Sequence, residues 1–442
     1  MRLVTLVAVE KFVIQGGVPL SGEIVPAGNK NAALPILAAC LLTEEELVVR
    51  NVPRIRDVES MLGLLEKIGV EVAWTGENEV RLQADAIEGV EVDEELANRI
   101  RASFLIAGPL LARCGEVRMP PPGGDTIGRR RLDAHLDAFI DLGAKVDGDG
   151  VWIELSAPPA GLKPKRIFMD EPSVMGTENA LLAAALTEGP TTVANAACEP
   201  HVQDLARLLC KMGAEVDGIG SNVMTVHGRD KLGGAEHDIC PDHIEIASFM
   251  ALAAATSGEL RIRDVVPEDL EGVRRHFRRI GLQTMVEDDD LLVPPEQKLT
   301  IRDDQGDAIP KIDDGPWPAF PADLTSIALA LATQADGTIL IFEKMFENRL
   351  FFVDKLVAMG ARITLCDPHR AIVSGPSRLH GARLESPDIR AGMAMLIAAL
   401  AATGTSEIGN VAQIDRGYER IDVRLRELGA RIERVASERV PA

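Results

Sequence analysis

The sequence is poor in aromatic residues, which make up 3% of its 442 residues and include a single tyrosine. Its core must therefore be built mainly from alanine, leucine, valine and isoleucine. Basic side chains are also scarce, 47 against 68 acidic ones, so the formal net charge is −21. Because nucleic acids and anionic membrane surfaces bind basic faces, this balance argues against either of them as the main partner.

Dense cysteine patterns and long apolar runs are absent as well. Six cysteines are scattered without a CxxC pair, a usage typical of a reducing cytoplasm. The apolar runs "NALLAAALTEG" and "MAMLIAALAATG" are shorter than the roughly 20 residues that a membrane-spanning helix needs. The N-terminal run "LVTLVAV" is too short for a secretory signal. We therefore expect a cytoplasmic protein.

What the sequence does contain is a repeat of roughly seventy residues. Each copy has an apolar, alanine-rich helix, a short β-branched strand, an amphipathic helix such as "DVESMLGLLEKIG", and further strand. Each amphipathic helix is followed by a glycine, where a helix C-terminus favours a left-handed residue. The six glycines are Gly69, Gly143, Gly213, Gly281, Gly360 and Gly429.

Each unit is thus roughly βαβαββ and cannot bury its apolar faces alone. Three units closing on one another would form one lobe, and six would form two, with the midpoint near "HDICPDH" at residues 237–243. The opening strand "EKFVIQGG" could belong to either lobe. The predicted fold class is therefore α/β with two similar lobes, and the cleft between them is the expected ligand site.

Two motifs suggest an anion site. In "PAGNKNAALP", Lys30 and Asn31 open an apolar helix, whose N-terminus attracts anions. The alternative is that Asn29 is only an N-cap and Lys30 is solvated. In "PPPGGDTIGRRR", Asp125 lies between a Gly-Gly pair and three arginines, which indicates a mobile loop over an anionic ligand. The alternative there is a surface turn with an ion pair.

Four further motifs place charged side chains near helix starts. "GPWPAFPADLTS" contains Asp323, which could also be an N-cap. "FENRLF", "SPDIRAG" and "IDRGYERID" contain Arg349, Arg390 and Arg416, which the helix dipole disfavours unless an anion is bound. His237, Cys240 and His243 could mimic zinc ligands, but no second cluster completes such a site.

These six motifs, in this order, resemble the enolpyruvyl transferases over nearly the whole chain, from "GNKNAALP" to "IDRGYERI". The resemblance implies a two-lobed inside-out α/β barrel with three βαβαββ repeats in each lobe. It also implies that the chain starts in the second lobe, so that lobe 1 spans residues 30–240 and lobe 2 spans residues 1–29 plus 241–442. A monomer or a weak homo-oligomer is expected.

The implied reaction moves the enolpyruvyl group of phosphoenolpyruvate to the 3-hydroxyl of UDP-N-acetylglucosamine and releases phosphate, the first committed step of peptidoglycan synthesis. It proceeds by addition and elimination and implies no metal and no organic cofactor. By resemblance, Lys30, Arg130 and Arg416 would hold the phosphate of phosphoenolpyruvate. Arg349 and Arg390 would bind its carboxylate.

The acceptor half of the site follows from the same resemblance. Asn31 and Asp323 would hold the sugar, with Asp323 taking the hydroxyl proton. The remaining residues expected to contact the acceptor or its nucleotide are Arg131, Leu132, Asp133, His135, Ser173, Val174 and Met345. The expected supporting charges in or near the cleft are Asp57, Arg101, Glu245 and Asp388.

Asp125 would be the loop acid that delivers a proton to carbon 3 of phosphoenolpyruvate. Well-known members of the family have a cysteine there, so we expect insensitivity to epoxides of the fosfomycin type, because a carboxylate is a poorer nucleophile than a thiolate. Glu171, Met175 and Ala322 depart from the common pattern around the acceptor. Two alternatives therefore stay open: another uridine nucleotide as acceptor, or a catalytically idle protein that binds a UDP-sugar.

Overall fold

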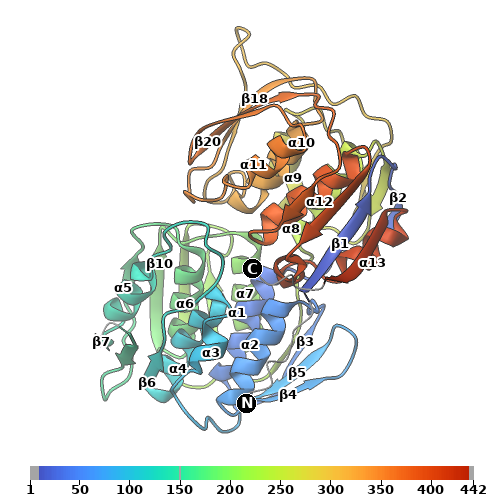
Figure 1. Cartoon of the computed structure of the whole chain (residues 1–442). Coiled ribbons are helices and arrows are strands. Elements are labelled where there is room, and N and C mark those ends of the chain that lie inside the picture. The colour runs from blue at the N-terminus through green and yellow to red at the C-terminus, as the bar shows by residue number, and fades with distance from the viewer. Residues whose placement is uncertain (1–8, 149–150, 438–442) are drawn as a thin grey trace.

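The computed structural model describes residues 9–148 and 151–437, so all of the N-terminal apolar run except Val9 lies outside the described residues. Figure 1 shows two lobes, each with helices enclosed by sheets. Buried apolar residues form two clusters that match them, one between residues 32 and 239 and one from residues 12–24 and 244–432. We call these parts lobe 1 and lobe 2. The clusters support our proposed domain boundaries near residues 30 and 240.

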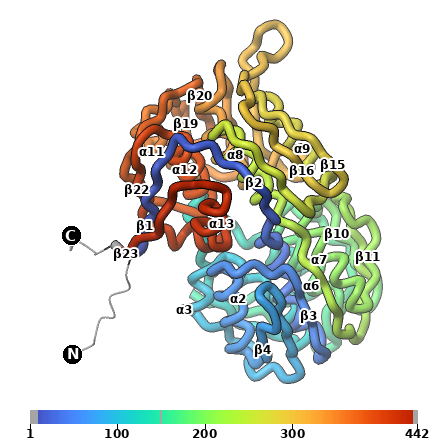
Figure 2. The backbone as a smooth tube through the Cα atoms, turned by 90° about the vertical axis from the view of Figure 1, so that its right-hand side faces the viewer, coloured from blue at the N-terminus to red at the C-terminus, as the bar shows by residue number. Residues whose placement is uncertain are grey.

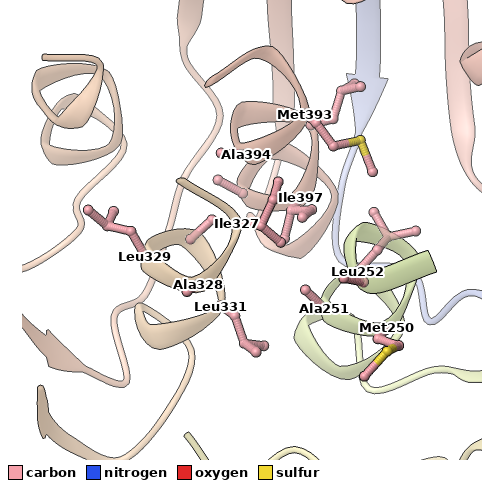
Figure 3. Packing of buried hydrophobic residues seen from close by; sticks show 14 of the residues in the cluster. Met250, Ala251, Leu252, Ile327, Ala328, Leu329, Leu331, Met393, Ala394 and Ile397 are labelled. Carbon is pink, nitrogen blue, oxygen red and sulfur yellow. The ribbon is translucent and has the colours of Figure 1, made fainter. Parts of the chain in front are cut away.

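The centre of each lobe is filled by three apolar helices. Those of lobe 1 are α1 (Lys30–Ala38), α4 (Ala107–Cys114) and α6 (Val174–Ala185), and those of lobe 2 are α8 (His243–Ala255), α10 (Thr325–Ala332) and α12 (Ile389–Ala401). Helices that are apolar on all sides are stable only when they are enclosed. Figure 3 shows Leu252 of α8, Ile327 of α10 and Ile397 of α12 in the apolar centre of lobe 2.

Six sheets surround these helices. In lobe 1 the first sheet has the strand order β13 (Ala235–Asp238), β3 (Leu47–Arg50), β5 (Val80–Gln83), β4 (Glu71–Trp74). The second has the order β6 (Glu116–Met119), β8 (Ile153–Ser156), β7 (Lys145–Gly148). The third has the order β11 (Glu215–Asp217), β12 (Val223–Gly228), β10 (Gly189–Ala194), β9 (Arg166–Phe168). In lobe 2 the first sheet has the strand order β15 (Met285–Glu287), β16 (Asp290–Val293), β14 (Glu259–Ile262), β2 (Ser21–Ile24). The second has the order β17 (Lys311–Asp313), β18 (Gly337–Phe342), β20 (Arg370–Gly375), β19 (Ile363–Asp367). The third has the order β21 (Arg383–Glu385), β22 (Thr405–Gly409), β1 (Val9–Gln15), β23 (Arg431–Ser437).

The outer helices are amphipathic and bury one face. They are α2 (Arg56–Lys67), α5 (Asp133–Asp141), α7 (Pro200–Lys211), α9 (Pro267–Phe277), α11 (Val353–Ala358) and α13 (Ile421–Glu427), with a single turn at α3 (Glu94–Ala97). Short 3₁₀ helices occur at η1 (Ala39–Leu42), η2 (Arg101–Ile106), η3 (Ala322–Leu324) and η4 (Val411–Arg416). With one sheet per repeat, the arrangement confirms the predicted two-lobed inside-out barrel of six units.

The repeat glycines have the backbone conformation that the sequence predicts. Their φ angles are 102°, 98°, 111°, 97°, 100° and 95° in chain order, which side chains with a Cβ rarely adopt. The predicted helix ends are therefore confirmed at all six positions.

The chain passes twice between the lobes. β1 pairs with β22 and β23 and β2 with β14, so the opening strand lies in lobe 2, while β13 pairs with β3 of lobe 1. Figure 2 shows the N-terminal segment beside β23 and α13 before it descends into lobe 1. The two crossing segments lie side by side: the N–H of Asn29 donates to the carbonyl of Cys240 at 2.8 Å, and that of Asp242 to Ala27 at 2.9 Å.

None of the helices in the part of the chain that the structure describes is long and apolar enough to cross a membrane.

Candidate active site

A cavity of about 240 Å³ lies between the lobes, and the N-terminal ends of the inner helices line it. Lys30 is the first residue of α1, His243 the first of α8, Arg390 the second of α12, and Asp323 lies in η3 directly before α10. Because each helix N-terminus presents free N–H groups and a partial positive charge, their convergence favours an anionic ligand.

Each of the two interpretations of the lysine motif agrees with part of the observed geometry. Asn29 is the N-cap of α1, since its Oδ1 accepts the N–H groups of Asn31 and Ala32 at 2.9 and 3.2 Å. Lys30, however, is buried rather than solvated, and its Nζ lies 2.8 Å from Oδ2 of Asp57. The lysine therefore lines the cavity with its charge balanced by an acid of α2.

Arg416, at the end of η4, joins the two lobes. Its Nε lies 2.8 Å from Oδ1 of Asp57, and its Nη1 forms an ion pair with Asp125 of the loop. Burial opposes ionisation of Asp57, but Lys30 and Arg416 outweigh it and hold the pKa of that carboxyl below its usual range. Asp57 thus lies between two cations that favour its ionised form.

Asp323 does not act as a helix cap. Its Oδ1 accepts Nη2 of Arg349 at 2.9 Å, and its Oδ2 accepts Nε and Nη2 of Arg390 at 3.0 and 2.9 Å. Although burial works against ionisation, the charges of Arg390 and Arg349 keep the pKa of Asp323 far below its ordinary value. Arg390 also donates to Oη of Tyr418, the only tyrosine of the chain, at 3.2 Å.

The loop that carries Asp125 lies across the cleft. Its glycines have a packing role: a Cβ on Gly123 would lie 1.8 Å from the carbonyl oxygen of Asn98, and one on Gly124 would meet Arg101 at 2.9 Å. On the other side, the carbonyl of Ile127 accepts the N–H of Asn348 in lobe 2 at 3.0 Å. Asp125 is therefore an ion-pair partner, as the surface-turn alternative proposes, but its partner is Arg416 across the cleft.

Arg101 and Arg130 line the cavity without a carboxylate partner in the described residues. Nη2 of Arg101 donates to the carbonyls of Arg130 and Arg131 at 2.6 and 3.1 Å, which holds the loop. Burial, with a contribution from Arg130, lowers the pKa of Arg101 to about 10, and burial also lowers that of Arg130. Two cations held in this way leave the cavity with excess positive charge.

Most of the side chains predicted for the site therefore meet in this one cavity. They are Lys30, Asn31, Asp57, Arg101, Asp125, Arg130, Val174, Asp323, Met345, Arg349, Arg390 and Arg416.

The other predicted residues lie outside the cavity lining, where three of them have local partners. Ser173 is the N-cap of α6, with its Oγ accepting the N–H of Gly176 at 3.2 Å. Asp388 is the N-cap of α12, where its Oδ1 accepts two N–H groups at 2.9 Å. Glu245 pairs with Arg424 at 2.5 Å beside the crossing segments.

The stretch from Arg131 to His135 also lies outside the cavity lining. Arg131 pairs with Asp133 on the exposed surface, Nε to Oδ2 at 2.7 Å. Leu132 packs against the core of lobe 1. His135 is buried beside Phe104 and hydrogen-bonds the amide of Asn179 at 2.9 Å, so its ring does not reach the cavity. The predicted nucleotide contacts of these residues stay predictions.

Sequence reasoning missed part of the cavity wall, namely Glu178, Glu199, His201 and Trp317, and assigned His243 only to a zinc alternative. A signal existed for Glu178, the only charged residue of the alanine- and leucine-rich helix α6. The zinc candidates have separate hydrogen bonds: His237 with Oδ1 of Asp204 at 3.0 Å, and His243 with the amide of Asn29 at 3.1 Å. No cluster of three metal-ligating side chains is present within residues 9–148 and 151–437.

Comparison with known proteins gives relatives of the same length. Residues 14–425 match the family described as EPSP synthase (3-phosphoshikimate 1-carboxyvinyltransferase). The chain is 57% identical over 425 residues to a UDP-N-acetylglucosamine 1-carboxyvinyltransferase of Bradyrhizobium diazoefficiens, covering 96% of this chain and 98% of the relative. It is 53% identical over 423 residues to the protein of the same name from Treponema denticola, covering 96% and 99%.

Solved structures show the same fold. The enolpyruvyl transferase NikO from Streptomyces tendae superposes with a TM-score of 0.85 at 24% identity, covering 98% of this chain and all of NikO. An EPSP synthase from Acinetobacter baumannii superposes with a TM-score of 0.74 at 18% identity, covering 96% of this chain and all of the other. The chain therefore belongs to the enolpyruvyl transferase family, together with the UDP-N-acetylglucosamine 1-carboxyvinyltransferases, and is an enzyme of this kind.

Proposed function

We propose that this enzyme transfers the enolpyruvyl group of phosphoenolpyruvate to the 3-hydroxyl of UDP-N-acetylglucosamine, with release of phosphate, as the first committed step of peptidoglycan synthesis. The observation that carries the proposal is the gathering of six basic side chains from both lobes around one cavity, in a protein of net charge −21. They are Lys30, Arg101, Arg130, Arg349, Arg390 and Arg416. The names of the relatives support the same reaction.

The basic side chains would divide between the two anionic groups of phosphoenolpyruvate. Lys30, Arg130 and Arg416 would hold the phosphate, and Arg349 and Arg390 the carboxylate. As the bond from carbon 2 to the phosphate oxygen breaks in the elimination, negative charge builds on the leaving phosphate, and fixed cations stabilise it without having to reorganise. Ion pairs with Asp57 and Asp323 fix all of these cations except Arg130 in position beforehand.

Two aspartates would move the protons. Asp323 would take the proton of the attacking hydroxyl while the new bond forms between its oxygen and carbon 2, and Asp125 would protonate carbon 3. In the elimination, the bond from carbon 2 to the phosphate oxygen breaks, Asp125 takes a proton back from carbon 3, and the hydroxyl proton leaves with phosphate. Asp125 must exchange Arg416 for substrate during this cycle, because the two form an ion pair here.

The substrates are small molecules, and the six cysteines, all free in the described residues, support a cytoplasmic site of action. A monomer or a weak homo-oligomer remains our prediction. No organic cofactor or metal enters the proposed reaction.

The test is phosphate release from phosphoenolpyruvate with UDP-N-acetylglucosamine, compared with UMP and with no acceptor. We expect release only with the UDP-sugar, and a product whose mass has increased by one enolpyruvyl group. Release with UMP alone would indicate a different uridine nucleotide as acceptor. Binding of the UDP-sugar without any release would indicate the idle alternative and contradict the proposal.

A further inference from the structure

One part of the cavity wall carries buried polar atoms that the described residues leave without a hydrogen-bond partner. They are Oε1 of Glu178, Oε2 of Glu199 and both ring nitrogens of His201. Glu178 is 1% exposed and His201 5%, and all three side chains line the cavity. Because an unsatisfied buried polar group is destabilising, three such groups around one cavity point to a ligand that satisfies them.

The geometry of this wall is fixed from both lobes. His201 is the second residue of α7, and its ring stacks on that of His243, with centroids 6.1 Å apart and planes 10° apart. The His243 ring meets Trp317 of lobe 2 edge to face at 5.8 Å. The main-chain N–H of Trp317 lies 3.5 Å from Oε1 of Glu199, which leaves Oε2 of that carboxyl unpartnered.

Burial favours the uncharged form of each of these side chains, unlike the basic part of the cavity. Burial, reinforced by the neighbouring Glu199, raises the pKa of Glu178 well above its ordinary value, and burial raises that of Glu199. Burial lowers the pKa of His201 to about 3, and the nearby His243 contributes to the shift in the same direction. A protonated carboxyl and a neutral imidazole each offer one donor and one acceptor, so they match uncharged hydroxyl or amide groups.

We propose that Glu178, Glu199 and His201 form a specificity subsite that hydrogen-bonds the uncharged hydroxyl and acetamido groups of the acceptor sugar. The proposal rests on the proposed function and adds the residues that select the acceptor. The subsite adjoins Asp323, which would hold the reacting hydroxyl, since both line the same cavity and the Asp323 charge acts on His201. A site built to hydrogen-bond a substrate group discriminates strongly against analogues that lack it.

The test compares three variants of the full-length enzyme. His201→Phe and Glu178→Leu remove hydrogen-bonding groups and keep similar volumes, and we expect each to raise the KM for UDP-N-acetylglucosamine about tenfold or more while the KM for phosphoenolpyruvate stays within about twofold. Glu178→Gln should raise the KM for UDP-N-acetylglucosamine less than Glu178→Leu does, because an amide also offers a neutral donor and acceptor.

The matched control is Thr191→Val. The Thr191 hydroxyl is also buried and unpartnered but does not line the cavity, so its removal should leave both KM values unchanged. Unchanged acceptor KM values in folded His201→Phe and Glu178→Leu would overturn the proposal.

A second measurement uses only the wild type and does not depend on how the variants fold. UDP-glucose lacks the acetamido group, and UDP-N-acetylgalactosamine has the opposite configuration at carbon 4. We expect kcat/KM for at least one analogue to be about tenfold or more below that for UDP-N-acetylglucosamine. Equal values for all three sugars would overturn the subsite. A wild type that releases no phosphate with any of them would instead contradict the proposed function.

Discussion

At the scale of single residues, every aspartate in the cavity is paired with a cation. Asp57 lies between Lys30 and Arg416, and Asp323 lies between Arg349 and Arg390. Removing one member of a buried pair leaves the other charge uncompensated, so such substitutions affect both stability and binding. Asp125 differs because it lies on a loop and is proposed to exchange its partner during turnover.

We predict that Asp125→Asn lowers kcat for phosphate release at least about 100-fold, because an amide cannot deliver the proton to carbon 3. Asp125→Cys should keep measurable activity and become inactivated by fosfomycin in a time-dependent manner, since a thiolate is the better nucleophile. The wild type should not be inactivated. Mass spectrometry of the treated proteins checks both statements.

Asp141→Asn serves as the control for these variants, because Asp141 pairs with Lys165 on the surface of lobe 1 and should not affect turnover. A fosfomycin adduct on Asp125 of the wild type, or unchanged turnover in Asp125→Asn, would show that the assigned role is wrong.

A second residue-scale prediction concerns pH. Burial raises the pKa of Glu343 from its ordinary 4.5 to about 8, although Arg349, 3.8 Å away, opposes the shift. The folded state therefore binds a proton more tightly than the unfolded state, and this stabilisation is complete below pH 4.5 and is lost as the pH rises through 8. The Tm should fall between pH 6 and 9, and should fall less in Glu343→Gln, which cannot ionise.

Thermal melting across this pH range measures the change of Tm with pH. Glu188→Gln, at an exposed position, is the control and should show the same change of Tm with pH as the wild type. Identical slopes in Glu343→Gln and the wild type would rule out Glu343 as a source of the pH dependence.

At the scale of the elements, each amphipathic helix must end so that the chain can enter the outer sheet, and a glycine allows this at all six positions. The surroundings of these glycines differ. A Cβ on Gly429 would meet nothing within 4 Å, whereas one on Gly281 would lie 2.3 Å from the main-chain nitrogen of Thr300. Both are in lobe 2 and have nearly equal φ angles of 95° and 97°.

This pair yields a prediction that separates backbone strain from steric contact. Gly429→Ala should destabilise the enzyme by about 1–2 kcal/mol, the cost of a left-handed conformation with a Cβ. Gly281→Ala should lower the Tm clearly further, because the main chain of Thr300 must also move. Thermal melting of both variants makes the comparison, and equal Tm values would contradict a steric role for the Thr300 contact.

At the scale of the whole molecule, both lobes contribute to the excess of positive charge around the cavity. Arg130 comes from lobe 1, Arg349 and Arg390 come from lobe 2, and the ion pairs of Arg416 connect the two. An anion bound between the lobes would contact cations of both, so its binding would stabilise the arrangement of the two lobes.

We therefore predict that inorganic phosphate, the proposed product, raises the Tm at constant ionic strength, since a ligand that binds only the folded state stabilises it by mass action. Arg130→Gln should lose most of this shift, because Arg130 has no carboxylate partner of its own among the described residues. Arg129→Gln, with an exposed side chain outside the cavity lining, should keep it. Equal shifts in both variants would mean that phosphate binds elsewhere.

Much of the architecture was predictable because it depends on local pattern. Apolar helices alternating with amphipathic ones, and a glycine after each of the latter, recur every seventy residues or so and predict six units. The placement of β2 in lobe 2 and of β13 in lobe 1 was not predictable from the residues alone, because strand pairing joins residues more than 180 positions apart. For the same reason the residue pattern left the lobe of β1 open.

The amino-acid sequence by itself determined the helix ends, the apolar centres and the inventory of charged motifs, since these follow from periodicity and side-chain chemistry within a few turns. Only the tertiary structure decided which charges meet: Asp125 pairs with Arg416, 291 residues away, rather than with the adjacent arginines. It also placed Glu178 and His201 together on a cavity wall. Coulomb forces and hydrogen bonds act over a few ångströms of space, and only the folding of both lobes brings these groups within that range.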